Sequence, residues 1–127
     1  MSWQKKEEYV RKVLSERFGV KFKEGDVRLR GTNKTYRFDL VSPNGSIVGE
    51  VKTYVSPTKS GKRPSAKIAH ASEACLFLMH AEGAKKRLLV FTDKNFYTLY
   101  KNERQGQMAK ANGIEIMLVN ARMRKRK

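Results

Sequence analysis

Two acidic residues and a lysine near the middle of the sequence have types and spacing suited to chemistry. Glu50 and Lys52 lie two positions apart in a segment of apolar and small residues, and ten residues separate Asp39 from Glu50. Side chains two positions apart on a β-strand emerge on the same face. We therefore expect Glu50 and Lys52 to lie together, and a hairpin can place Asp39 beside them.

These residue types predict a metal-dependent reaction at phosphorus. Neighbouring carboxylates repel each other, and a divalent cation relieves that repulsion while it recruits water and phosphate oxygens. Mg²⁺ prefers this ligand set, with Mn²⁺ as the substitute. A lysine beside them can orient or deprotonate the attacking water, or stabilise a pentavalent phosphate. The competing interpretation is that Asp39, Glu50 and Lys52 form a solvent-facing ion cluster across two strands.

The charge balance points to an acidic polymer as partner. The chain has 127 residues, with 28 Lys+Arg against 12 Asp+Glu, so its formal net charge is +16. The length suits one domain, and a hydrophobic content of 39% is typical of a globular protein. Each cation near a phosphate can release a condensed counterion, so an acidic polymer is the expected partner. An anionic membrane surface is a more distant alternative.

Several classes of protein are excluded. The longest apolar run, Ala74–Met79, is far shorter than the roughly 18 residues that a membrane span needs. The sequence is charged from Lys5 onward and shows no apolar signal region, and Cys75 is the single cysteine, which rules out an intrachain disulfide. We expect a cytoplasmic protein with no membrane partner and no small-molecule substrate.

The elements that must position these residues follow from hydrophobic periodicity. Apolar residues recur at helical spacing from Trp3 to Phe18, with Gly19 as the expected C-cap. The turn Ser42-Pro-Asn-Gly predicts a hairpin between the second and third strands. Strands are expected at Asp26–Arg30, Thr35–Val41, Ser46–Val55, Leu88–Thr92 and Ile114–Val119. Further helices are expected at Ala66–Glu82 and Phe96–Ala111, although Gly106 weakens the second one.

This order, α-β-β-β-α-β-α-β, describes an α/β domain with one mixed sheet flanked by helices, and its strand-helix-strand units imply parallel crossovers. In the second strand, period-two alternation places Asp39 on one face, with Phe38 and Leu40 together on the other. We expect Cys75 and three methionines in the core, and packing roles for two aromatic residues of the first helix. The methionines are Met79, Met108 and Met117, and the aromatic residues are Trp3 and Tyr9.

The hairpin also carries a resemblance to a known family. Phe38-Asp39, ten residues and then Glu50-Val51-Lys52, with a helix before and a helix after, resemble the PD-(D/E)XK nuclease superfamily. That superfamily includes restriction endonucleases, archaeal Holliday-junction resolvases and Mrr-like enzymes. The resemblance extends from Glu7 to Val119, although Phe38 stands where the family pattern has proline. It implies a single restriction-endonuclease-like domain over residues 1–121, followed by a basic tail over residues 122–127.

The resemblance also implies roles for individual residues. Asp39, Glu50 and the main-chain carbonyl of Val51 match the family's metal ligands, and Lys52 matches its catalytic lysine. Resolvase-like members add a glutamate in the first helix, for which Glu8 is the match and Glu7 the alternative. A polar residue in the helix after the Glu-x-Lys pair is frequent in the family. The candidates for it are Lys67, His70 and Ser72.

Basic residues outside the hairpin are the expected contacts to the DNA backbone. They occur in the Pro- and Gly-containing loop over residues 56–65, in the helix that follows and in the tail. The tail is either a phosphate-binding arm or a disordered solubilising end. The predicted nucleic-acid-binding residues are Lys59, Lys62, Arg63, Lys67, Arg122, Arg124, Lys125 and Arg126.

Together, the residues and the resemblance predict a Mg²⁺-dependent DNA endonuclease that acts on duplex or branched DNA, in either a structure-selective, Holliday-junction-resolvase-like manner or a restriction-like one. A homodimer is expected, because two active sites can then meet two strands. The alternative is a non-catalytic basic nucleic-acid-binding module on a nuclease-like fold. EDTA and Glu50→Ala discriminate between the two, since only the nuclease needs a metal at Glu50.

Overall fold

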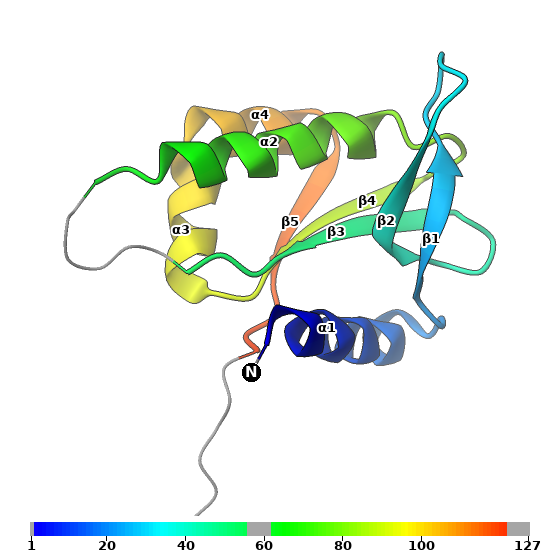
Figure 1. The fold of residues 1–127 in the computed structure, drawn as a ribbon, viewed down its shortest axis with the longest axis horizontal. Helices are drawn as coiled ribbons and strands as arrows, with labels where there is room; N and C mark the ends of the chain where they lie inside the picture. Colours follow the sequence, from blue (N-terminus) through cyan, green and yellow to red (C-terminus); the bar gives the residue numbers. More distant parts are fainter. Residues whose placement is uncertain (1, 56–61, 122–127) are drawn as a thin grey trace, which may run out of the picture.

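A five-stranded mixed sheet lies at the centre of the molecule, with one helix on one face and three on the other (Figure 1). The computed structural model describes residues 2–55 and 62–121. The elements are α1 (Trp3–Phe18), β1 (Lys23–Arg28), β2 (Thr35–Val41), β3 (Ile47–Lys52), α2 (Ser65–Met79), β4 (Lys86–Phe91), α3 (Lys94–Asn102), α4 (Arg104–Ala111) and β5 (Ile114–Leu118).

The strands lie side by side in sequence order, from β1 at one edge to β5 at the other. β1, β2 and β3 are antiparallel neighbours, whereas β3, β4 and β5 run parallel. The predicted hairpin and the predicted parallel crossovers are therefore confirmed, as is the mixed α/β class.

Helix α1 begins and ends where its capping residues indicate. The Ser2 side chain accepts a hydrogen bond from the Lys5 N–H at 3.2 Å, and Gly19 adopts a left-handed φ of 68° at the C-cap. Val10 and Leu14 are fully buried, in one cluster with apolar side chains of β2, β3 and β4. One stripe of α1 thus covers this face of the sheet.

Helices α2, α3 and α4 cover the opposite face. Their buried side chains, among them Ile68, Leu78 and Tyr100, pack with Phe38 and Leu89 of the sheet. Cys75 is buried in this layer, as expected. Since α2 and the α3–α4 pair both cross over this same face, the outer side of α1 stays uncovered by other helices (Figure 1).

The helix predicted over residues 96–111 is two helices. The chain is extended at Glu103, with φ −77° and ψ 156°, and α4 begins at Arg104. Gly106 then packs directly against the carbonyl oxygen of Tyr100, in space where a Cβ would overlap that oxygen. The break and the glycine belong together, because only a residue without a side chain lets α4 fold back so closely on α3.

The alternation predicted for β2 is wrong. Lys23 pairs with Val41 and Gly25 pairs with Phe38, so Glu24 lies opposite two residues, Asp39 and Leu40. Such a β-bulge shifts the side chains that follow it to the other face. Phe38 accordingly packs beneath α2, whereas Leu40 packs beneath α1.

Several apolar residues expected to pack are exposed instead. Met108 is 62% exposed, Trp3 57% and Tyr9 43%, while Met79 and Met117 are half-buried. The helical period places such residues on a stripe, but exposure depends on whether another element covers that part of the stripe. Across residues 2–55 and 62–121, the helices all fall short of the length and apolar character needed to cross a membrane.

The contact at Gly106 generates a stability prediction. Gly→Ala inside a helix ordinarily stabilises a protein by about 0.5–1 kcal/mol. We expect Gly106→Ala to lower the free energy of unfolding by about 1–3 kcal/mol instead, because the new methyl group overlaps the Tyr100 carbonyl. Urea denaturation measures the change. The exposed neighbour in the same helix provides the control, Gln107→Ala, with an expected change below about 0.5 kcal/mol; a stabilising Gly106→Ala would contradict the packing described.

Candidate functional site

The predicted acidic residues meet where β2 and β3 part. The two strands pair at Leu40 with Gly49 and at Val41 with Val48, and β3 then continues beside β4 alone. Beyond that point, side-chain carboxylates take the place of main-chain hydrogen-bond acceptors between the two strands. The Asp39 N–H donates to Glu50 Oε2 at 3.1 Å, and the Val51 N–H donates to Asp39 Oδ2 at 2.8 Å. The hairpin therefore brings Asp39 and Glu50 together, as expected from the sequence.

Glu50 is one of the most deeply buried charged residues of the described chain, with an exposed fraction of 2%. Its Oε1 accepts a hydrogen bond from the Tyr36 hydroxyl at 2.9 Å, and the Tyr36 ring stacks on Phe77 of α2 with centroids 4.3 Å apart. Burial raises the pKa of Glu50 to about 7, with a further increase from the charge of Asp39. The Tyr36 bond and Lys52 lower that pKa in part.

A second group of carboxylates forms around the other side of Asp39. Glu7 of α1, Glu24 of β1 and Asp39 each offer a carboxylate oxygen, and these three oxygens lie within 4.8 Å of one another. Burial and the charge of Asp39 raise the pKa of Glu7 to about 7. Burial also raises the pKa of Asp39. Three carboxylate oxygens at this spacing match the oxygen ligands that a hard divalent cation takes. A bound cation would replace the protons that the raised pKa values favour.

The structure brings Glu7 to this site rather than Glu8. Glu8 is exposed and does not belong to the carboxylate group. The two residues are neighbours on α1, so the helical turn separates their directions by about 100°. The geometry thus favours the alternative match, Glu7, as the acidic residue contributed by the first helix.

Positive side chains surround the carboxylates. Arg11 donates to the Asp39 carbonyl oxygen at 3.2 Å and lies 3.9 Å from Glu24 Oε2, and Arg37 lies 3.3 Å from Glu24 Oε1. The charge of Lys52 lowers the pKa values of Glu7, Asp39 and Glu50. Lys52 lies two residues after Glu50 on β3, so strand geometry places both side chains on the same face.

Among the polar candidates in the helix after β3, Lys67 reaches the site region. Its Nζ donates to the Val55 carbonyl at 3.3 Å and lies 6.0 Å from the Tyr54 ring centroid, and the Nζ of Lys52 lies 5.9 Å from the same centroid. Ser72 instead bonds to Ile68 and Tyr100 beneath α2, and His70 is exposed.

The other predicted DNA-binding residues differ in their surroundings. Arg63 is engaged in an ion pair with Glu103, whose Oε1 lies 2.8 Å from Nη2, so it tethers the start of α2 to the junction of α3 and α4. Lys62 is exposed. The remaining predicted contacts lie outside the described residues: Lys59, Arg122, Arg124, Lys125 and Arg126.

Sequence reasoning missed Glu24, Arg11 and Tyr36. Glu24 precedes the expected first strand, which begins at Lys23 instead of Asp26. Arg11 lies one helical turn after Glu7, so identifying Glu7 would have placed it on the same face. Tyr36 lies three residues before Asp39 in β2, but its bond to Glu50 depends on the bulge, for which no sequence signal was apparent.

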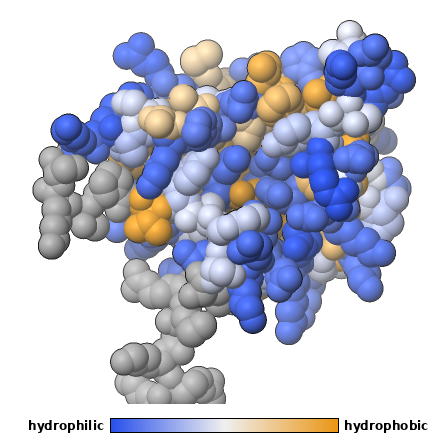
Figure 2. Space-filling view, in the orientation of Figure 1, coloured by the Kyte–Doolittle hydropathy of each residue, from blue (hydrophilic) through white to orange (hydrophobic). Residues whose placement is uncertain are grey.

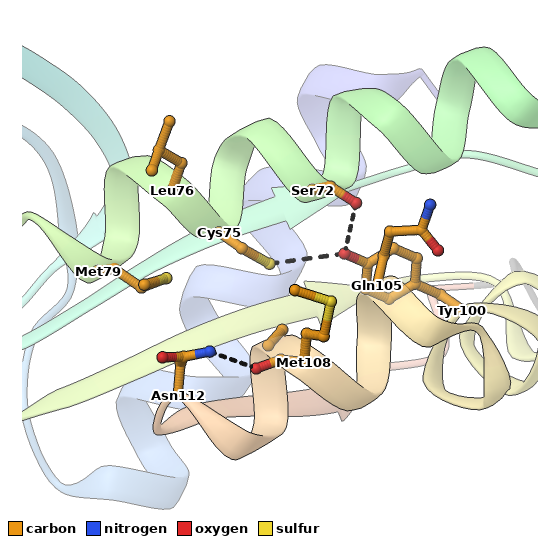
Figure 3. A pocket seen from close by; sticks show the side chains of 9 residues that line it. Ser72, Cys75, Leu76, Met79, Tyr100, Gln105, Met108 and Asn112 are labelled. Carbon is orange, nitrogen blue, oxygen red and sulfur yellow. Dashed lines mark hydrogen bonds between the residues drawn. The ribbon is translucent and has the colours of Figure 1, made fainter.

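A separate hollow lies between α2 and α4, on the face of the sheet opposite α1 (Figure 3). Its volume is about 220 Å³, and it is lined by uncharged residues that include Leu76, Met79 and Met108. Ser72 and Cys75 both point to the Tyr100 hydroxyl, with Ser72 Oγ at 3.0 Å and Cys75 Sγ at 3.7 Å. None of the predicted catalytic residues lines this hollow.

Comparison of the chain with protein-family models, with curated proteins and with solved structures finds no match.

The raised carboxyl pKa values generate a pH prediction. Glu7 and Glu50 have pKa values of about 7 in the folded protein against an ordinary 4.5. Between these values the folded state binds more protons than the unfolded state, so the free energy of unfolding falls as the pH rises from about 4.5 to about 7.

We expect Glu7→Gln and Glu50→Gln each to flatten this decline, because an amide does not titrate. Urea denaturation in EDTA at a series of pH values measures the slope, with Glu16→Gln, an exposed acid on α1, as the matched control. A slope that neither site variant alters would show that these carboxyl groups do not carry the pH dependence.

Proposed function

We propose that this protein is a Mg²⁺-dependent deoxyribonuclease of the PD-(D/E)XK type, an endonuclease that hydrolyses phosphodiester bonds. The observation that carries the proposal is the position of Asp39 where β2 leaves β3. Its N–H donates to Glu50, its carboxylate oxygen lies within 4.8 Å of oxygens of Glu7 and Glu24, and Lys52 follows Glu50 by two residues on β3. Carboxylates gathered at one point would repel the acidic polymer that a chain with a net charge of +16 is expected to bind. A cation held between the carboxylates and a phosphate would remove that repulsion.

The architecture supports the same proposal. The first six elements follow the order α-β-β-β-α-β that the resemblance implies, with β3 and β4 parallel across α2. The acidic residues lie at the end of the β2–β3 ladder and Lys52 is the last residue of β3. A restriction-endonuclease-like domain is therefore the fold assignment we favour, with Phe38 in place of the proline of the family pattern.

The roles of the residues follow from their positions. Glu7, Asp39 and Glu50, with the main-chain carbonyl of Val51, would hold Mg²⁺ or Mn²⁺, and Glu24 lies close enough to assist. A bound ion would supply Lewis acidity and lower the pKa of a water molecule. Lys52 would orient the attacking water and donate to the phosphate oxygens. Tyr36 fixes the rotamer of Glu50 through its hydroxyl.

The DNA substrate is proposed from what surrounds the site. Hydrophilic residues cover most of the face seen in Figure 2, α1 included. Cationic side chains contact the DNA backbone without reading base sequence, so we favour recognition of DNA shape, in branched or duplex DNA. A homodimer would present two such sites to two strands.

The direct test is cleavage of labelled four-way junction, linear duplex and single-stranded DNA with Mg²⁺ or EDTA. We expect cutting that requires the metal, and a loss of about 100-fold or more in the cleavage rate for Glu50→Ala and for Lys52→Ala. The matched controls are Glu8→Gln and Lys12→Ala, which alter exposed charges on α1 without touching the carboxylate group.

Each outcome decides between the two candidate classes. Metal-dependent cutting that the site variants lose establishes the nuclease, and the preferred DNA identifies the substrate. Tight binding that is indifferent to EDTA and to Glu50→Ala, without cutting in Mg²⁺, would replace the proposal with a non-catalytic basic binding module.

A further inference from the structure

Trp3 is exposed although it lies on the same side of α1 as two fully buried residues. It precedes Val10 by seven residues and Leu14 by eleven, so on a helix it lies within about 20° of both around the axis. Val10 and Leu14 are fully buried against the sheet, whereas Trp3 is 57% exposed. Figure 1 shows why: the first turn of α1 lies at the end of the sheet where β3, β4 and β5 finish.

The Trp3 side chain therefore starts on the side of α1 that carries Glu7, a member of the carboxylate group. Glu7 follows Trp3 by one helical turn, which is about 6 Å along the axis, and Arg11 follows Glu7 by another. Glu7 shares the carboxylate group with Asp39, and Arg11 bonds to the Asp39 carbonyl oxygen. Trp3, Glu7 and Arg11 thus form one stripe, with the aromatic ring at its outer end.

The chemistry of this stripe selects the kind of partner. A flat aromatic face next to a phosphate-binding site matches a nucleotide, whose base offers a π face of the same kind. Lys5 and Lys6 accompany Trp3 in the first two turns of the helix, and the whole chain carries a charge of +16. Within a paired duplex the base faces are already stacked on each other, so away from the duplex ends only an unpaired base is free to cover the indole.

We infer that Trp3 is a stacking platform for an unpaired base of the strand whose phosphate occupies the carboxylate site. This inference rests on the proposed function and names its substrate class: DNA with a single-stranded segment, such as a fork, a flap or an open junction. A fully paired linear duplex is the poorer substrate.

Trp3 is the one tryptophan of the chain, so its fluorescence reports on this position directly. The experiment titrates the full-length protein in EDTA with oligothymidylate, with a blunt duplex of equal length and with inorganic polyphosphate. Binding is followed in parallel by the anisotropy of an end label on each DNA and by competition for polyphosphate. We expect oligothymidylate to quench the tryptophan emission as it binds, and the duplex and polyphosphate to bind without that quenching.

Variants separate stacking from charge. Trp3→Ala is expected to weaken oligothymidylate binding between about 5-fold and about 150-fold, the contribution of one stacked base. It should leave duplex binding unchanged, and Trp3→Phe should restore most of the loss. Tyr9→Ala removes another exposed aromatic ring of α1 and serves as the matched control, with unchanged affinity expected. Thermal unfolding of each variant verifies that the core is intact.

Three results would overturn the inference. The first is binding of oligothymidylate, seen by anisotropy, without quenching of the tryptophan emission. The second is a Trp3→Ala variant that binds single-stranded and duplex DNA with equally reduced affinity, and the third is no binding of either DNA. Enhanced, blue-shifted emission with anionic phospholipid vesicles and no response to DNA would assign the ring to a membrane surface. The two proposals can fail independently. Quenching without any Mg²⁺-dependent cutting would support the stacking site and contradict the nuclease. Mg²⁺-dependent cutting without quenching would support the nuclease and contradict the stacking site.

Discussion

Buried carboxylates take the place of main-chain hydrogen-bond partners where β2 leaves β3, and the rest of the site depends on this substitution. A buried N–H needs an acceptor, and the N–H groups of Asp39 and Val51 lose theirs when the ladder stops. Glu50 and Asp39 supply the acceptors. Glu50 of β3 thus accepts a hydrogen bond from the backbone of β2, and Asp39 of β2 accepts one from the backbone of β3. If either carboxylate moved away, an N–H group of the neighbouring strand would lose its acceptor.

This arrangement concentrates like charges in a poorly solvated place. Burial and the charge of Asp39 raise the pKa values of Glu7 and Glu50 to about 7. Lys52 offsets part of both increases, and Arg11 offsets part of the increase at Glu7. A fold that maximised its own stability would have neutral side chains here. The cost in stability is understandable if the carboxylates are retained to hold a divalent cation, whose charge replaces the protons.

The parts of the fold that local signals encode were predictable. Gly19 and the Ser42–Gly45 turn marked the end of α1 and the hairpin, and the hairpin brings Glu50 beside Asp39. The bulge at Asp39 and Leu40 was not predictable, because it arises from how β1 pairs with β2 and not from any single segment. The break between α3 and α4 likewise depends on a contact between distant backbone atoms at Gly106.

The difference between local and long-range signals also explains which site residues were predictable from the sequence. A motif in adjacent strands identifies Asp39, Glu50 and Lys52, since their relative positions are set by pairing within one hairpin. The choice between Glu7 and Glu8 depends on how α1 is rotated against the sheet, which Val10 and Leu14 determine by burial. Glu24 joins the group only through the bulge opposite it.

The central claim is that the carboxylates gathered by Asp39 bind a divalent cation, and calorimetric titration with Mn²⁺ tests it most directly. Glu7→Gln and Glu8→Gln are a matched pair, because they make the same chemical change at neighbouring positions of α1. The account predicts saturable binding by the wild-type protein, at least about tenfold weaker binding by Glu7→Gln and unchanged binding by Glu8→Gln. Equal Mn²⁺ affinities for all three proteins, or no binding at all, would contradict it.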